Sequence, residues 1–271
     1  LLRILSNHGV DHKIAGRLAG QTTETGQTID LSARQIVDTT APYELVSRMR
    51  ASFWVIGPLL GRMGKAKVSL PGGCAIGTRP VDFYLQALER LGVSIEIEAG
   101  YVIAEARHGL KGAEIFFPKV SVGATHTALM AAVLADGKSV IHNAAREPEV
   151  VDLADLLNKM GAKITGAGTA TIEIDGVSRL HGARHSVLPD RIETGTYAMA
   201  VAMTGGDVLL ENARYDLLKA AFDVLQRVGI TVEKKENGSV LPETGLAFPP
   251  PTSRPSRFRA SRPICRHSSW R

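Results

Sequence analysis

A glycine-rich stretch with a cysteine at its centre holds the residue types best suited to chemistry in this sequence. It runs from Leu70 to Asp82 and reads Leu-Pro-Gly-Gly-Cys-Ala-Ile-Gly-Thr-Arg-Pro-Val-Asp. Glycines let the backbone approach a ligand closely, and the apolar-periodic residues that follow predict a helix whose free N–H groups can face an anion. Arg79 adds a fixed positive charge, in whose field the Cys74 thiol ionises more easily. A Gly-rich turn around an inert, buried cysteine explains the same pattern.

Three polar loops before other expected helices are further candidates. A lysine ahead of a Ser-x-Gly helix start, as in Lys119-Val120-Ser121-Val122-Gly123, can hold a phosphate. The alternative is a capped helix with a surface lysine. The loops at residues 143–149 and 190–196 also fit simple charge complementarity to a helix dipole. His126 lies among small residues and is interpreted as structural. His8 and His12 have no partner at metal-ligand spacing, so we predict no metal site.

An internal repeat predicts the elements that carry these loops. Three glycines, Gly64, Gly137 and Gly206, each end an apolar helical pattern and precede a short strand. A second helix then ends at Gly92, Gly161 or Gly229, and an alternating strand follows each time. The second set of glycines recurs at intervals of 69 and 68 residues, which indicates one packing unit used several times. Gly9-Val10 resembles the end of an earlier copy, and the segment from Tyr43 to Met63 predicts one long helix with a kink or break at Pro58.

Composition excludes several classes of protein. The chain has 271 residues, 44% hydrophobic and 22% charged, as in a globular protein of one or two domains. No apolar run approaches the length of a membrane span, and two distant cysteines make no disulfide framework, so a reducing cytoplasm is the expected compartment. The net charge of +5 comes from six arginines after Phe248, and subtracting them leaves −1, which argues against a nucleic-acid-binding body.

Four of these segments, in this order, resemble the UDP-N-acetylglucosamine 1-carboxyvinyltransferase family of enolpyruvyl transferases. They are residues 71–82, 119–125, 143–149 and 188–195, and the likeness runs from Leu1 to about Gly238. The resemblance implies an α/β (α+β) fold in which pseudo-threefold repeated helix–strand units form an inside-out α/β barrel domain. It places a nucleotide-sugar-binding domain, without its N-terminal part, at residues 1–188, and the first unit of an incomplete second domain at residues 189–238.

The resemblance also implies the reaction, which is transfer of the enolpyruvyl group from phosphoenolpyruvate to the 3-hydroxyl of UDP-N-acetylglucosamine with release of phosphate, the first committed step of peptidoglycan synthesis. Cys74 would be the catalytic acid on a mobile loop. No metal or organic cofactor is implied, and the partners are the two substrates rather than nucleic acid or membrane. The residues expected to bind the nucleotide sugar are Arg50, Arg79, Pro80, Val81, Asp82, Phe83, Lys119, Val120, Ser121 and Val122.

The sequence departs from this family at both ends. The family's Lys-Asn pair for phosphoenolpyruvate would precede Leu1, and its later aspartate and C-terminal arginine would follow residue 238. Residues 239–271 are Arg/Ser/Pro-rich and aperiodic, so we interpret them as an aberrant, disordered tail and hypothesise a frameshift. Three alternatives remain open. The first is a transferase acting on shikimate 3-phosphate, which the presence of Cys74 disfavours, and the second is a catalytically inactive fragment that at most binds UDP-N-acetylglucosamine. The third is nucleic-acid binding by the basic tail.

Overall fold

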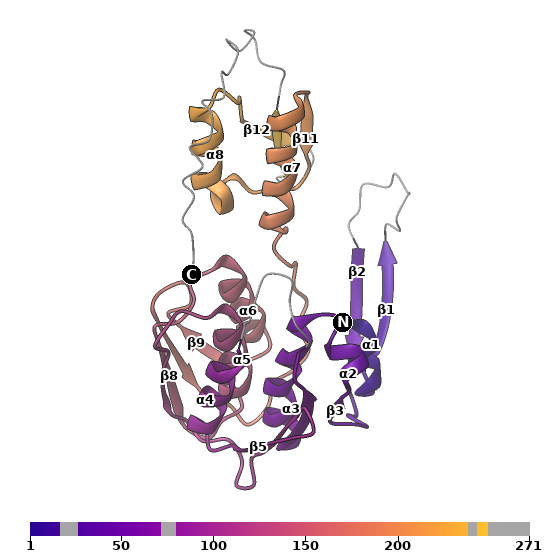
Figure 1. The fold of residues 1–271 in the computed structure, drawn as a ribbon, viewed down its shortest axis with the longest axis vertical. Coiled ribbons are helices and arrows are strands. Elements are labelled where there is room, and N and C mark those ends of the chain that lie inside the picture. Colours follow the sequence, from indigo (N-terminus) through magenta and orange to yellow (C-terminus); the bar gives the residue numbers. More distant parts are fainter. Residues whose placement is uncertain (17–26, 72–79, 238–242, 249–271) are drawn as a thin grey trace, which may run out of the picture. The chain divides into compact units, whose positions relative to one another are not determined.

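The chain folds into two units of unequal size. The computed structural model describes residues 1–16, 27–71, 80–237 and 243–248. Contacts between Cα atoms divide the chain into unit 1, Leu1–Ser186, and unit 2, Val187–Arg271 (Figure 1). The sequence predicts a domain boundary after residue 188. Within the described residues no helix is long and apolar enough to cross a membrane.

The first repeat in unit 1 has the helix–strand–helix–hairpin order that the sequence predicts. Gly64 ends its first helix with a left-handed φ of +68°, and its N–H donates to Leu60 O over 2.9 Å. The repeat consists of α3 (Ile56–Met63), β4 (Lys65–Ser69), α4 (Asp82–Arg90), β5 (Ser94–Glu98) and β6 (Tyr101–Glu105). The short β3 (Thr40–Ala41) pairs with β4 in parallel, and the sheet order is β3-β4-β6-β5.

The second repeat copies the first. It consists of α5 (Val122–Ala132), β8 (Lys138–His142), α6 (Pro148–Lys159), β9 (Lys163–Thr165) and β10 (Thr171–Asp175). Its sheet order, β7-β8-β10-β9, again starts with a short parallel strand, β7 (Glu114–Phe116). Gly161 follows the second helix with φ +99°, as Gly92 does in the first repeat with φ +88°. The repeated glycines therefore mark helix ends, and the predicted internal repeat is confirmed.

The third repeat forms unit 2 and contains a strand that the sequence did not indicate. Its sheet order is β11-β13-β12, the same as β4-β6-β5 in the first repeat. The repeat consists of α7 (Arg191–Thr204), β11 (Val208–Leu210), η2 (Tyr215–Leu218), α8 (Lys219–Arg227), β12 (Glu233–Asn237) and β13 (Glu243–Phe248). Strand β13 lies within the segment that composition assigned to a disordered tail. It is ordered by backbone pairing with strands on both sides, a long-range effect that composition does not report. Residues 249–271 lie outside the described residues.

The central position of β13 leads to a test by truncation. A chain ending at Asn237 should lose protection of the β11 and β12 amides against hydrogen exchange, because both strands pair with β13 and not with each other. A chain ending at Phe248 is the matched control and should keep that protection. Equal protection in the two truncated chains would contradict the assigned pairing. Protection in unit 1 should be the same in both.

The N-terminal part of unit 1 differs from the single long helix expected at residues 43–63. It contains α1 (Leu2–Asn7), the hairpin β1 (Asp11–Gly16) and β2 (Gln27–Ser32), α2 (Tyr43–Val46) and the 3-10 helix η1 (Arg50–Val55). The helical pattern is broken between α2 and η1, not at Pro58. Pro58 lies in the first turn of α3, where a missing N–H costs no intrahelical hydrogen bond.

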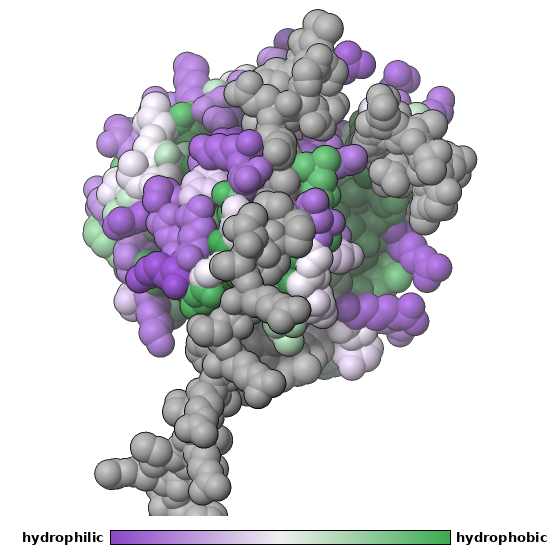
Figure 2. Space-filling model, turned by 90° about the horizontal axis from the view of Figure 1, so that it is seen from above, coloured by the Kyte–Doolittle hydropathy of each residue, from purple (hydrophilic) through white to green (hydrophobic). Residues whose placement is uncertain are grey.

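Helix α5 lies at the centre of unit 1. Nine of its eleven residues are buried, and it contacts α3, α4 and α6 (Figure 1). Its alanines and Gly123 let these helices approach closely. Helix α7 occupies the equivalent place in unit 2, packs on α8 and η2, and leaves Ile192, Met199 and Met203 exposed. Hydrophobic surface residues also appear among hydrophilic ones in Figure 2.

Candidate functional site

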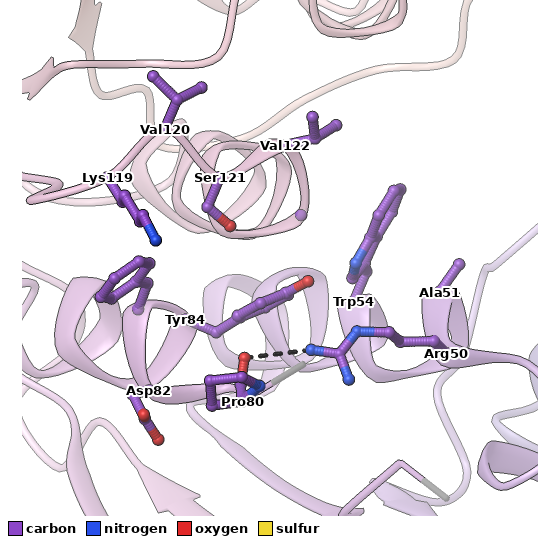
Figure 3. A pocket seen from close by; sticks show the side chains of 12 residues that line it. Arg50, Ala51, Trp54, Pro80, Asp82, Tyr84, Lys119, Val120, Ser121 and Val122 are labelled. Carbon is purple, nitrogen blue, oxygen red and sulfur yellow. Dashed lines mark hydrogen bonds between the residues drawn. The ribbon is translucent and has the colours of Figure 1, made fainter. Parts of the chain in front are cut away.

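A pocket of about 820 Å³ opens where three helices of unit 1 begin. Its walls come from η1, from the start of α4 and from the start of α5 (Figure 3). The first N–H groups of a helix have no intrahelical acceptor, so two helix N-termini bring partial positive charge to one cavity. Arg50 and Lys119 add full positive charges to the lining. The pocket is therefore suited to an anionic ligand.

The structure brings together most of the residues that the sequence analysis assigned to substrate binding. Val81 is the exception among the described residues, because its side chain is buried at 8% exposure and is not part of the lining. Cys74 and Arg79 lie outside the described residues. Eight expected residues line the pocket: Arg50, Pro80, Asp82, Phe83, Lys119, Val120, Ser121 and Val122.

Ser121 shapes the α5 side of the pocket. Its Oγ accepts a hydrogen bond from the Ala124 N–H at 3.4 Å, so it is the N-cap of α5. The hydroxyl of Thr125 donates to the Ser121 carbonyl over 2.8 Å. Figure 3 shows the Lys119 amine and the Ser121 hydroxyl turned toward the space between α5 and α4. The capped helix of the alternative interpretation is present, and its first residues, Val122 and Gly123, line the pocket.

Arg50 links η1 to the start of α4. Its Nη2 donates a hydrogen bond to the Pro80 carbonyl over 3.1 Å (Figure 3). Its guanidinium also lies over the Tyr84 ring, 6.0 Å from the ring centroid. These contacts hold a cation in the lining of the pocket, between two segments that are 30 residues apart in the chain.

Sequence reasoning missed three lining residues, Ala51, Trp54 and Tyr84, whereas Gly123, which also lines the pocket, belongs to the candidate phosphate motif at residues 119–123. Tyr84 packs edge-on against Phe53, with ring centroids 5.6 Å apart and an interplanar angle of 81°. The Trp54 ring stacks on the His126 ring, with the centroids 4.6 Å apart and an interplanar angle of 10°. His126 is fixed in turn by a 2.8 Å hydrogen bond between its Nδ1 and Val122 O, as its structural interpretation expects. In the sequence these aromatic residues read only as apolar positions of helices.

The remaining polar loops serve the fold. Asn143 has φ +55°, and its side-chain amide donates to Phe117 O over 2.9 Å. Asn212, at the equivalent place after β11, has φ +58°. Asp190 is the N-cap of α7, where its Oδ1 accepts from the N–H groups of Ile192 and Glu193. Helix capping accounts for the contacts of Asp190, and Glu149 in the first turn of α6 fits dipole complementarity. Within the described residues no group of three or more His, Cys, Asp or Glu side chains is placed to hold a metal ion.

Comparison with known proteins places the fold and the sequence in one family. Residues 13–249 match the family described as EPSP synthase (3-phosphoshikimate 1-carboxyvinyltransferase). A Methylobacterium radiotolerans protein named UDP-N-acetylglucosamine 1-carboxyvinyltransferase is 70% identical over 238 residues, which cover 88% of this chain and 56% of that protein. A protein of the same name from Azorhizobium caulinodans is 67% identical over 250 residues, which cover 92% of this chain and 58% of that protein. The chain thus spans somewhat more than half the length of these relatives.

Solved structures of enolpyruvyl transferases share the fold. The enolpyruvyl transferase NikO from Streptomyces tendae superposes with a TM-score of 0.72 at 23% identity, covering 91% of this chain and 56% of that chain. EPSP synthase from Acinetobacter baumannii gives a TM-score of 0.65 at 19% identity, and the match covers 92% of this chain and 55% of that chain. The expected fold class is confirmed. On its repeated α/β units, its family match and these relatives, the chain belongs to the EPSP synthase family of enolpyruvyl transferases.

Proposed function

We propose that this chain carries the nucleotide-sugar site of an enolpyruvyl transferase that acts on UDP-N-acetylglucosamine. The reaction transfers the enolpyruvyl group of phosphoenolpyruvate to the 3-hydroxyl of the sugar and releases phosphate, the first committed step of peptidoglycan synthesis in the cytoplasm. The observation that carries the proposal is the gathering of eight expected binding residues, from three separate segments, around one pocket. The names of relatives at 64–70% identity favour this substrate over shikimate 3-phosphate.

The lining of the pocket fits the parts of a nucleotide diphosphate sugar. Lys119, Arg50 and the α5 N-terminus offer positive charge and N–H donors, which suit a diphosphate. Pro80 and Phe83 offer apolar surface at the same pocket, which suits the face of a uracil ring. The combination of a donor-rich wall with an apolar wall distinguishes such a ligand from a small phosphorylated acid.

The proposed chemistry is general acid catalysis beside bound anions. The 3-hydroxyl gives its proton to a base while its oxygen adds to the central carbon of phosphoenolpyruvate, and the methylene carbon takes a proton from the acid. Elimination of phosphate and loss of a proton from the new methyl group then regenerate the double bond. By the family resemblance, Cys74 supplies the first proton, and cations nearby stabilise the phosphate. The residues need no redox or organic cofactor for these steps.

The binding half of the proposal leads to a prediction for Lys119. The change Lys119→Ala should weaken UDP-N-acetylglucosamine binding about tenfold, because a charge-assisted hydrogen bond to phosphate is lost. Isothermal titration calorimetry measures the effect. Lys65→Ala, which removes an exposed lysine of β4 that does not line the pocket, is the matched control and should bind as the parent chain does. Equal affinity of the Lys119 variant and the control would show that Lys119 does not contribute to binding of the nucleotide sugar.

The catalytic half is tested separately by phosphate release. The purified chain is mixed with phosphoenolpyruvate and UDP-N-acetylglucosamine, with Cys74→Ala as the control. Turnover that disappears in this control supports the full proposal. Binding without turnover selects the alternative, a chain that binds the nucleotide sugar but does not catalyse transfer. Absence of both binding and turnover would overturn the proposed function.

A further inference from the structure

Two polar atoms in the pocket converge on one point of α5, and one of them, the indole Nε1 of Trp54, has no hydrogen-bond partner among the described residues. The indole Nε1 of Trp54 is buried and has no acceptor. Tyr84, only 6% exposed, lines the same pocket, and its hydroxyl is a second hydrogen-bonding group there. A buried N–H without a partner costs free energy unless a ligand or a water satisfies it.

Gly123 shows how closely these atoms approach α5. A Cβ built on Gly123 would lie 1.9 Å from the Tyr84 hydroxyl oxygen and 2.9 Å from Trp54 Nε1. Both polar atoms therefore point at the second residue of α5, in the turn whose N–H groups have no intrahelical acceptor. Figure 3 shows the Tyr84 hydroxyl and the Trp54 ring on the same side of the pocket.

The contacts of both rings fix the two atoms in place. Tyr84 is held edge-on by Phe53, which is itself 1% exposed. Trp54 is stacked on His126, whose ring is hydrogen-bonded to the α5 backbone. Because the rings are held by packing, the two polar atoms are restricted to a few positions relative to α5. Such preorganisation favours recognition of one defined group.

The chemistry of this corner favours an anionic oxygen. An indole N–H can only donate, and the Tyr84 hydroxyl can donate. The Arg50 guanidinium lies over the Tyr84 ring, and the α5 N-terminus adds partial positive charge. We infer that Trp54 Nε1 and the Tyr84 hydroxyl donate to an oxygen of the ligand's diphosphate, and that they position the nucleotide sugar at the start of α5. This inference rests on the proposed function and assigns two residues to it.

The indole N–H signal gives a direct test. The chain contains two tryptophans, Trp54 and Trp270, so a Trp270→Phe variant leaves one indole cross-peak in a ¹H–¹⁵N spectrum. This peak should move downfield on addition of UDP or UDP-N-acetylglucosamine and should not move with uridine. The same titrations give Kd for a Tyr84→Phe variant, which removes only the hydroxyl and should bind UDP and UDP-N-acetylglucosamine about tenfold more weakly.

Tyr43→Phe is the matched control, because Tyr43 is 54% exposed and does not line the pocket. Its affinities should equal those of the parent chain, and thermal unfolding should show all variants folded. The inference would be overturned if the chemical shift of the Trp54 peak did not change when UDP binds, or if the Tyr84→Phe variant bound with unchanged affinity. A loss of affinity for UDP-N-acetylglucosamine alone would also overturn it, since that would assign the hydroxyl to the sugar. Failure of the parent chain to bind either nucleotide would instead reject the proposed function on which the inference rests.

Discussion

Replacing Phe53 by alanine should lower the free energy of unfolding of unit 1 by about 3–5 kcal/mol, the largest stability effect we expect near the pocket. Phe53 is 1% exposed and belongs to the core cluster between η1, α4 and α5. Its removal leaves a cavity and takes away the edge contact with Tyr84. Urea unfolding followed by Trp54 fluorescence, in a Trp270→Phe background, measures the loss beside the altered site.

Phe116→Ala is the matched control for this change. Phe116 is 61% exposed, and its ring stacks on the His142 ring with the centroids 4.2 Å apart and an interplanar angle of 9°. Its replacement should cost less than about 1 kcal/mol, because little apolar surface is buried there. Losses of similar size for Phe53→Ala and Phe116→Ala would contradict the assigned core.

Replacing Gly123 by alanine should weaken UDP-N-acetylglucosamine binding about 100-fold, because the methyl group displaces two hydrogen-bond donors at once. The new Cβ would meet the Tyr84 hydroxyl oxygen at 1.9 Å, which no real contact allows. Tyr84 and Trp54 must therefore move, and the methyl group also narrows the pocket. Calorimetric titration of the folded variant measures the loss of affinity.

Gly195→Ala provides the comparison for a helical glycine without crowding. A Cβ on Gly195, in α7, would have its nearest neighbour, Leu218 Cδ2, at 3.6 Å, an ordinary van der Waals contact. Alanine there should leave nucleotide-sugar binding unchanged and stabilise unit 2 by up to about 1 kcal/mol through its higher helix propensity. If Gly123→Ala behaved in the same way as Gly195→Ala, the close approach of Tyr84 to α5 would be wrong.

Much of the candidate site could be predicted from the sequence because its residues lie at helix starts. Ser121 carries a local signal for capping and is the N-cap of α5. Pro80 carries a signal for the first helical turn, but it lies two residues before α4 begins at Asp82. Tyr84 and Trp54 carry no such signal. Each occupies a position that the helical pattern marks as apolar. Whether its polar atom lies in the core or at the pocket depends on how the neighbouring helix packs against it.

The sequence alone determined the repeat. Glycine after a helix adopts positive φ at no steric cost, a local property that Gly64, Gly92 and Gly161 show wherever they occur. The motifs that resemble the enolpyruvyl transferases could also be recognised in the sequence. They lie in loops and consist of residue types with a clear chemical role.

Only the tertiary structure decided three other features. It divided residues 43–63 into α2, η1 and α3, it placed β13 between β11 and β12, and it brought Trp54 and Tyr84 to Gly123. Each depends on packing or backbone pairing between segments far apart in the chain. Such interactions are set by which surfaces meet, and no local pattern of residues encodes the neighbour that a segment will find.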